Sequence, residues 1–306
     1  MALRSLDNAL PISPGRPKKL AKVAVCIQKP PILGVNDENK APIPAAANVD
    51  SAIDYIASDD LKAMQDPETK IQTLMEELDS KDWTKVCESL NDARRFAIYH
   101  RSFLLPILDK VMLVMVKAMN NPRSALCKAS IMASSDIFNS FGDNIVAFDA
   151  FDPLLLQLLL KASQDKKFVR EEAVKALQVM VESLAPLALL HKLLVYVTHS
   201  NLRVRAKAAV SISKCVSKMG QEGMKEFGLV SLIRVAADLL NDRLPEARDA
   251  ARSTVMLVYE AVIRDEEQKL QNDDHDGLSS MELWLNFCCS NLTAIQAQSM
   301  SKIIPS

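Results

Sequence analysis

Glycine and aromatic residues are both scarce in this sequence of 306 residues. It contains only 7 glycines, and aromatic residues make up 5% of it. Tight turns, phosphate-binding loops and β-strands depend on these residue types, so the composition argues against a large β-protein and against a nucleotide-binding α/β enzyme. Hydrophobic residues make up 49% of the chain, which is enough to bury a large core.

Residues that carry catalytic or metal chemistry are also few. None of the four histidines lies in an H-E-x-x-H motif, no two of the six cysteines form a C-x-x-C pair, and no G-x-S-x-G motif is present. His191 and His199 are eight residues apart on one predicted helix, but no third metal ligand accompanies them. We therefore expect no enzymatic activity, no metal and no cofactor, and we interpret the cysteines as reduced thiols, mostly in the core.

Long apolar runs and a strong net charge are absent as well. The most apolar stretches are interrupted by charged residues such as Asp109, Lys110 and Asp149, so none is long enough to cross a bilayer. The first residues lack the apolar core of a signal peptide. The net charge is -1. We therefore expect a cytoplasmic protein without a membrane partner, and any charge-driven binding has to be regional.

The first 60 residues differ in composition from the rest. Half of the 14 prolines fall there, and this density prevents regular helices, so we predict a disordered, mildly basic arm over residues 1–60. Its segment SPGRPKK (13–19) is similar to an AT-hook, which favours a nucleic-acid partner only weakly. Ser13 precedes a proline and fits a proline-directed kinase site, where a phosphate would reduce the local positive charge.

From Asp66 onwards the sequence has the signals of helices and their ends. Asp66-Pro67 predicts a helix start, with aspartate as the N-cap and proline at the first helical position. Asn121-Pro122 and Asp152-Pro153 repeat this pattern. Gly142 and Gly220 lie where helix C-caps are expected.

The helical pattern repeats about every 40 residues. The second helices of the predicted pairs align on Val86, Ala125, Val169, Val204 and Ala247. This period, with two helices per unit, predicts an all-α fold: an α-α superhelix of the HEAT/armadillo type with five to six helix pairs over residues 61–306. The predicted pairs are 67–79 with 83–98, 102–119 with 123–140, 153–163 with 167–184, 187–199 with 203–219, and 227–240 with 245–264. We expect a final helix around 280–303 to cap the end.

The turns inside these pairs are strongly basic. They hold ten basic and four acidic residues, whereas the turns between pairs sum to a charge of -3. In a solenoid all turns inside the pairs lie along one edge, so we predict a basic edge that attracts and steers an acidic protein. The ten basic residues are Lys81, Lys85, Arg123, Lys166, Lys167, Arg170, Arg203, Arg205, Arg243 and Arg248.

The sequence does not decide the role of three arginines on this edge or whether its tryptophan is exposed. Arg170, Arg205 and Arg248 lie one residue beyond the apolar anchor of their helices, where a basic residue either binds a partner or bridges repeats. Trp83 lies in the first turn and is either packed beneath the first helix or exposed as a binding anchor.

These segments resemble a TOG domain, the tubulin-binding HEAT array of microtubule regulators, and most closely that of the CLASP and crescerin-like group. The likeness covers residues 66–300 and rests on SKDWTKVCESL, NPRSALCKAS, KKFVREEAVKAL, NLRVRAKAAV and RLPEARDAARS. It implies that the basic edge binds the α/β-tubulin dimer and that the protein is cytoskeleton-associated. By the same resemblance, Trp83 contacts β-tubulin, Arg123 with Lys166 or Lys167 lies in the middle, and Arg203, Arg243 and Arg248 reach toward α-tubulin.

The main alternative is a generic HEAT or armadillo scaffold that binds another acidic protein or peptide. The ladder of Trp and Asn residues that an importin-like peptide groove needs is missing from the sequence. The chain has room for one TOG-like module, whereas microtubule polymerases and rescue factors join several. The sequence therefore favours accessory tubulin binding over processive polymerase activity.

Overall fold

The computed structural model describes residues 55–270 and 279–304, and all regular structure in these ranges is helical. The α-helices are α1 (Pro67–Leu78), α2 (Trp83–Tyr99), α3 (Arg101–Leu104), α4 (Leu108–Met119), α5 (Ser124–Phe141), α6 (Phe151–Ala162), α7 (Lys167–Ser183), α8 (Pro186–Leu194), α9 (Leu202–Phe227), α10 (Leu229–Leu239), α11 (Pro245–Leu270), α12 (Ser280–Asn291) and α13 (Ala294–Ser301). Short 3-10 helices are η2 (Ser58–Asp60), η3 (Leu105–Ile107), η4 (Gly142–Ile145) and η5 (Val195–Thr198).

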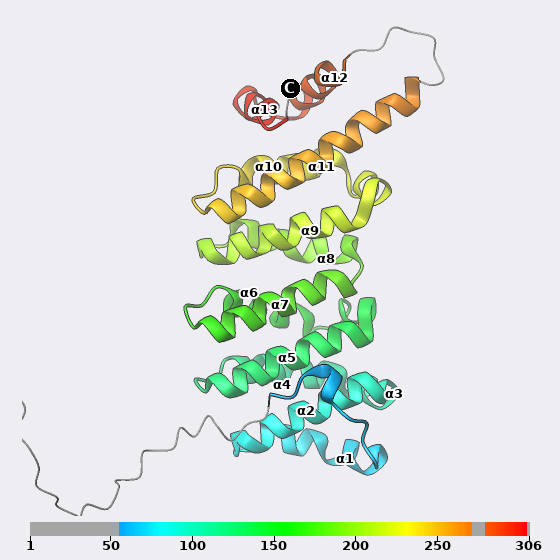
Figure 1. Ribbon diagram of the computed structural model, residues 1–306, viewed down its shortest axis with the longest axis vertical. Coiled ribbons are helices and arrows are strands. Elements are labelled where there is room, and N and C mark those ends of the chain that lie inside the picture. Colours follow the sequence, from blue (N-terminus) through cyan, green and yellow to red (C-terminus); the bar gives the residue numbers. More distant parts are fainter. Residues whose placement is uncertain (1–54, 271–278, 305–306) are drawn as a thin grey trace, which may run out of the picture. The chain divides into compact units, whose positions relative to one another are not determined.

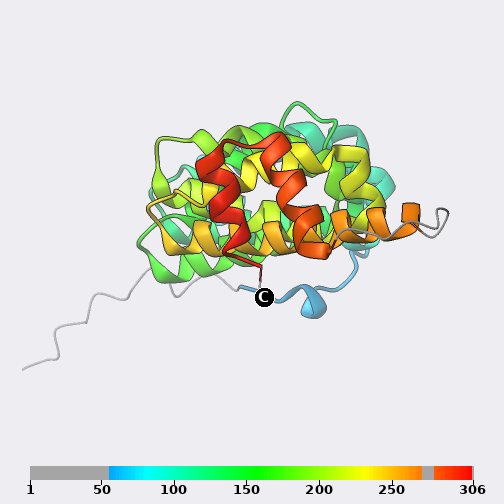
Figure 2. The same cartoon turned by 90° about the horizontal axis from the view of Figure 1, so that it is seen from above.

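The helices form a solenoid of stacked pairs, which confirms the predicted HEAT/armadillo-type fold (Figure 1). Helices α2, α5, α7, α9 and α11 pack on one another in one layer, and the first helices of the pairs form the second layer (Figure 2). The alanines four residues after the predicted anchors, at 129, 173, 208 and 251, are all buried. Because their side chains are small, neighbouring helices of the first layer can approach closely, and each pair completes the core of the next.

A short segment before α1 packs across α2 and α5. Ser58 donates a hydrogen bond to Asp136 on α5 at 2.6 Å, and the Tyr99 hydroxyl on α2 donates to the carbonyl of Leu61 at 2.6 Å. Residues 55–60, which the sequence assigns to the arm, therefore contact the solenoid. Ser13 and the rest of the predicted arm, through residue 54, lie outside the described residues.

Beneath this segment lies a buried ion pair. Arg94 on α2 donates from Nε to Asp136 at 2.5 Å, and the two side chains are 1% and 3% exposed. Arg94 also donates to Asn91, and Ser58 completes the hydrogen bonding of the carboxylate. The pair ties the first repeat to the second, because its two charges come from different pairs of helices.

The helix-end signals were partly right. Asp66 caps α1 by accepting a hydrogen bond from the Thr69 amide at 3.2 Å, and Gly142 ends α5 with φ +54°. At Asn121 and Asp152 the predicted helix starts were right to within two residues, because α5 begins at Ser124 and α6 at Phe151, but the predicted N-caps were wrong. Asn121 accepts from the amide of Arg123 and closes the turn before α5 instead of capping the helix. Asp152 already lies in the first turn of α6, where it pairs with Lys192 on α8 at 2.8 Å.

The expected single helix over 280–303 is also wrong, because two helices occupy this region. Leu292 is extended, with φ −128° and ψ 165°, and Thr293 forms a capping box with Gln296 that starts α13. The reciprocal hydrogen bonds satisfy the first amides of a new helix and allow the chain to turn back across the end of the stack. Among the described residues, no helix combines the length and apolarity that a membrane span requires.

Candidate protein-binding edge

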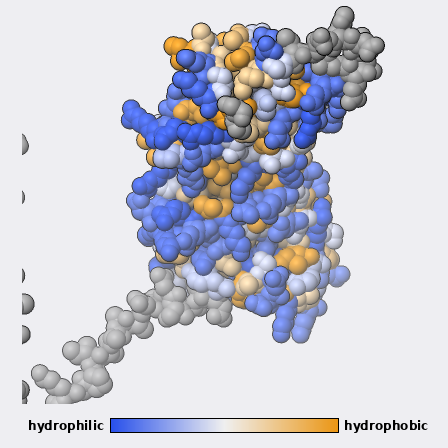
Figure 3. All heavy atoms as spheres, turned by 45° about the horizontal axis from the view of Figure 1, so that its top comes forward, coloured by the Kyte–Doolittle hydropathy of each residue, from blue (hydrophilic) through white to orange (hydrophobic). Residues whose placement is uncertain are grey.

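The loops inside the five helix pairs from α1 to α11 lie along one edge of the solenoid, on the left in Figure 1. The connections between pairs lie on the opposite side. Stacking of similar hairpins produces this separation, because every second helix begins at the same edge. The edge that carries the loops inside the pairs, again on the left in Figure 3, has a largely hydrophilic surface. The charges that are far apart in sequence are therefore brought into one row.

Seven of the ten predicted basic residues are exposed on this row. We refer to them as the basic edge: Lys81, Lys85, Arg123, Lys166, Lys167, Arg203 and Arg243. Within the described parts of the chain, Lys81, Lys85 and Arg243 take part in no ion pair with another side chain. No carboxylate of the described residues therefore lies within ion-pair distance of these three, although the charge of Lys85 contributes to lowering the pKa of Asp82.

At the first loop, Trp83 is half-buried and packs against the core at the start of α2. The guanidinium of Arg123, from the second loop, lies 5.0 Å from the centre of its ring. A cation at this distance over an indole face makes a favourable cation–π contact. Trp83 is thus part of the packing and also part of the edge, and it links the first two loops.

In the middle of the edge, the third loop presents two lysines and an aromatic ring. Lys166 donates a hydrogen bond to the Ser124 hydroxyl at 2.9 Å, and Lys167 lies 3.7 Å from Glu171 on the same helix. Phe168 follows them and is 45% exposed. Sequence reasoning missed Phe168, although an aromatic residue directly between two lysines and the anchor Val169 was a usable signal.

The third and fourth loops are joined by an ion pair. Arg203 donates to the carboxylate of Asp165 at 2.6 Å and to the carbonyl of Ser163 at 3.2 Å. The hydrogen bond from Arg203, and then its positive charge, lower the pKa of Asp165. The Arg203 side chain remains 57% exposed, so its guanidinium still faces solvent.

Arg170, Arg205 and Arg248 hold the loops themselves. Each donates from Nη1 to the carbonyl oxygen of the residue six positions earlier, at 3.2, 2.8 and 2.8 Å. Arg205 also pairs with Asp242 of the next loop at 2.7 Å. All three are half-buried, and their donors satisfy loop carbonyls that no helix can satisfy. These three arginines therefore stabilise the loops of the edge.

The opposite side of the solenoid uses its cations differently. Lys218 on α9 donates to the carbonyls of Val181, Glu182 and Leu184 at 2.7–3.0 Å, which caps the end of α7. Lys192 pairs with Asp152. These two lysines are thus bound to a helix end and to a carboxylate, whereas Lys81, Lys85 and Arg243 of the basic edge have no such partner among the described residues.

Comparison with known proteins identifies the family. The CLASP N-terminal family matches residues 98–281, which is more than half of the chain. This chain belongs to the CLASP N-terminal family. The match covers the second to fifth loops of the basic edge and begins after Trp83. It confirms the resemblance to TOG domains of the CLASP group.

Relatives and solved structures agree with this assignment. The chain is 25% identical over 248 residues to TOG array regulator of axonemal microtubules protein 1 of Mus musculus, covering 79% of this chain and 14% of the mouse protein. The human protein of that name is 29% identical over 127 residues, or 42% of this chain and 7% of its own length. The chain thus spans a small fraction of these relatives.

Among solved structures, the TOG domain of C. elegans Zyg9 matches with a TM-score of 0.54 and 16% identity over 79% of this chain and 90% of that one. The MAST/Orbit N-terminal domain matches with a TM-score of 0.50 and 18% identity over 75% of this chain and 94% of that one. At such identities these matches support the TOG-type fold of this CLASP N-terminal domain and do not assign its ligand.

Proposed function

We propose that this chain is a non-enzymatic tubulin-binding protein whose basic edge contacts the α/β-tubulin dimer, free or within a microtubule. The observation that carries the proposal is the row of exposed cations on five successive loops. The mouse and human relatives are named as regulators of axonemal microtubules, which supports a tubulin partner and a cytoskeletal location. A long basic strip recognises an extended acidic protein surface and accelerates its association.

The arrangement of the edge supports a division of roles along it. Trp83 with Arg123 forms a partly apolar end, which suits a desolvated contact. Arg203 and Arg243 at the other end are exposed and suit a wetter, charge-driven contact. By analogy with TOG domains, the Trp83 end would contact β-tubulin and the Arg243 end α-tubulin. Arg205 and Arg248 would act indirectly, by holding the loops.

The decisive experiment compares two triple variants of the full chain for binding to purified tubulin. One removes three charges from the edge: Lys167→Ala, Arg203→Ala and Arg243→Ala. The matched control removes three exposed charges from helix surfaces away from the edge loops: Lys110→Ala, Lys214→Ala and Arg264→Ala. Both change the net charge equally, so a difference between them reports position and not total charge.

We expect the edge variant to bind at least about tenfold more weakly at low salt and the control to stay within about threefold of wild type. Wild-type binding should weaken as salt rises, and the edge variant should show a smaller salt dependence. Absence of wild-type binding at tens of micromolar would overturn the tubulin proposal. The alternative, a scaffold for another acidic protein, would then be favoured by the same basic edge.

A further inference from the structure

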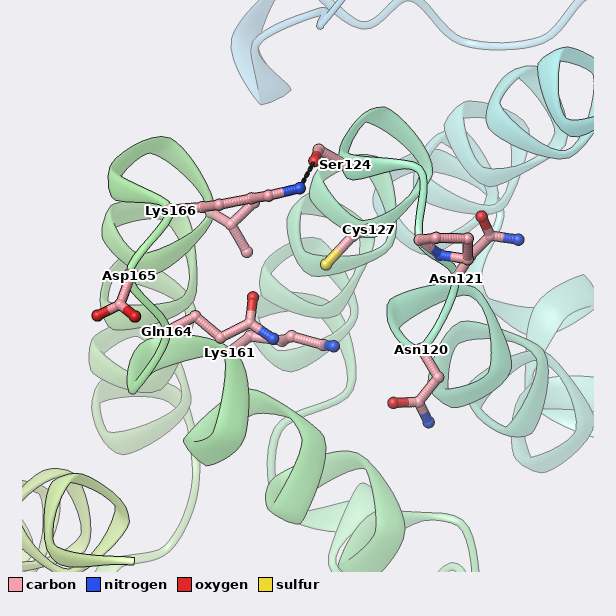
Figure 4. A pocket seen from close by; sticks show the side chains of 10 residues that line it. Asn120, Asn121, Ser124, Cys127, Lys161, Gln164, Asp165 and Lys166 are labelled. Carbon is pink, nitrogen blue, oxygen red and sulfur yellow. Dashed lines mark hydrogen bonds between the residues drawn. The ribbon is translucent and has the colours of Figure 1, made fainter.

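A polar cleft opens on the basic edge between the second and third loops (Figure 4). Its volume is about 470 Å³. The end of α4, the start of α5, the last turn of α6 and the loop before α7 form its walls. The cleft therefore lies across the junction of two repeats, in the middle of the edge.

Two ammonium groups from different elements converge on this space. Figure 4 shows the side chains of Lys161, from α6, and Lys166, from the following loop, both directed into it. Lys166 is oriented by its hydrogen bond to Ser124. Lys161 is half-buried, and its ammonium group makes no hydrogen bond or ion pair with any residue that the structure describes. A partly desolvated, unpaired lysine gains more from an anion than a fully exposed one does.

Negative charge in the cleft is already neutralised. Its one lining carboxylate, Asp165, points away from the space in Figure 4 and is paired with Arg203 at 2.6 Å. The Cys127 thiol also lines the cleft. Burial raises its pKa against the opposing effect of Lys161 and Lys166, so the sulfur carries no charge at neutral pH.

Neutral donors complete the lining. The side-chain amides of Asn120 and Gln164 border the cleft, and each offers two N–H groups. Helix α5 begins at Ser124 without a side-chain cap, so the positive end of an 18-residue helix faces the same region. Lysines and amides without an arginine fork suit a single carboxylate better than the bidentate capture of a phosphate.

We propose that this cleft receives an aspartate or glutamate side chain of the protein partner, bound by the ammonium groups of Lys161 and Lys166. The proposal rests on the proposed function, since tubulin supplies that carboxylate. It adds Lys161, a residue in the last turn of a first helix, to the contact surface. It also gives the middle of the edge a defined pocket in place of a diffuse charge attraction.

The first test measures tubulin affinity of full-length Lys161→Met and Lys161→Arg, with Lys110→Met as the matched control for loss of one lysine charge. We expect Lys161→Met to weaken binding ~10- to 100-fold, because a charge-assisted hydrogen bond is lost. Lys161→Arg and Lys110→Met should remain within about threefold of wild type. Equal affinities of Lys161→Met and Lys110→Met would overturn the proposal, provided that wild type binds.

The second test needs no tubulin and so separates failure of this proposal from failure of the proposed function. A hexaglutamate peptide is titrated into the isotope-labelled full chain, with hexaglutamine and inorganic phosphate as the other arms. We expect hexaglutamate alone to shift the amide signals of Gln164 and Cys127, and Lys161→Met to abolish the shift. A shift with phosphate only, or none with hexaglutamate, would overturn the carboxylate assignment. A hexaglutamate shift without tubulin binding would leave the cleft intact and overturn tubulin as its partner.

Discussion

Replacing Asp136 with leucine would leave the Arg94 guanidinium buried without its carboxylate. The two side chains are 1% and 3% exposed and are joined at 2.5 Å between α2 and α5. Leucine has the branched shape of aspartate but is bulkier, so the double variant that carries the same leucine is needed to separate the cost of packing from the loss of charge pairing. Water cannot easily solvate Arg94 there, because the segment around Ser58 lies over the pair.

Breaking a buried ion pair by removing one partner costs ~3–5 kcal/mol of unfolding free energy. With a urea m-value of ~2 kcal/mol/M, the midpoint of denaturation would fall by ~1.5–2.5 M. Removing both charges, in Arg94→Met with Asp136→Leu, replaces the pair with apolar groups and should cost clearly less than either single change. Unfolding is followed by circular dichroism at 222 nm in urea.

The exposed pair Arg252–Asp249 provides the control. Its side chains are 53% and 68% exposed, so Asp249→Ala should change the unfolding free energy by less than ~1 kcal/mol. A cost below ~1 kcal/mol for Asp136→Leu would refute the reasoning that the solenoid depends on this junction. A double variant as unstable as the sum of the two single variants would refute the argument that the cost is an unpaired charge.

Three further predictions concern the backbone, the loops and the thiols. Gly142→Ala should lower the unfolding free energy by ~1–3 kcal/mol, because φ +54° with ψ −133° strains any residue with a Cβ; an unchanged denaturation midpoint would contradict this. Burial tends to raise the pKa of Asp242. The hydrogen bonds from the Leu244 amide and from Arg205 outweigh that effect, so the net pKa lies below the ordinary value of 3.8. The ionised carboxylate therefore stabilises the folded state above pH 3.8, and this contribution is lost as the pH falls through the lowered pKa of the folded state. On acidification below pH 3.8, Asp242→Asn should therefore lose less unfolding free energy than wild type. At pH 7.5 iodoacetamide should modify the exposed Cys289 in the native protein, whereas Cys215, buried and with its pKa raised to about 12, should react only after unfolding, as peptide mass spectrometry would show.

Local patterns were enough to predict the five helix pairs and, to within one residue, the start of each second helix. The predicted helix 102–119 is divided into α3, η3 and α4, however, and α9 and α11 extend past the ends predicted at 219 and 264. The anchors from Val86 to Ala247 recur because each second helix needs one apolar stripe. The spacing of that stripe is visible within a single stretch of the sequence. Asp66 was recognisable for the same reason, since a capping aspartate and its amide partner are three residues apart. The break at Thr293 was also local and readable as a capping box, and the single capping helix expected around 280–303 overlooked it.

Two of the predicted helix caps failed, one because its side chain has a partner in another repeat and one because it bonds within its own turn. The sequence predicted Asp152 as a helix cap, but its carboxylate pairs with Lys192, which lies 40 residues later. Asn121 read as a cap and instead closes its own turn. Sequence does not reveal such choices, because a polar residue satisfies whichever partner the packed structure brings within reach.

The sequence by itself determined that this protein is a helical repeat array with basic turns on one side, because periodicity and turn composition are properties of neighbouring residues. Only the tertiary structure decided which of those basic residues are exposed and which hold the loops. Stacking of the repeats places Asp165 against Arg203 and Asp242 against Arg205, each pair 37 or 38 residues apart. The same stacking brings Lys161 and Lys166 around one cleft, since the distance between side chains of different elements is fixed by how the helices pack and not by their order along the chain.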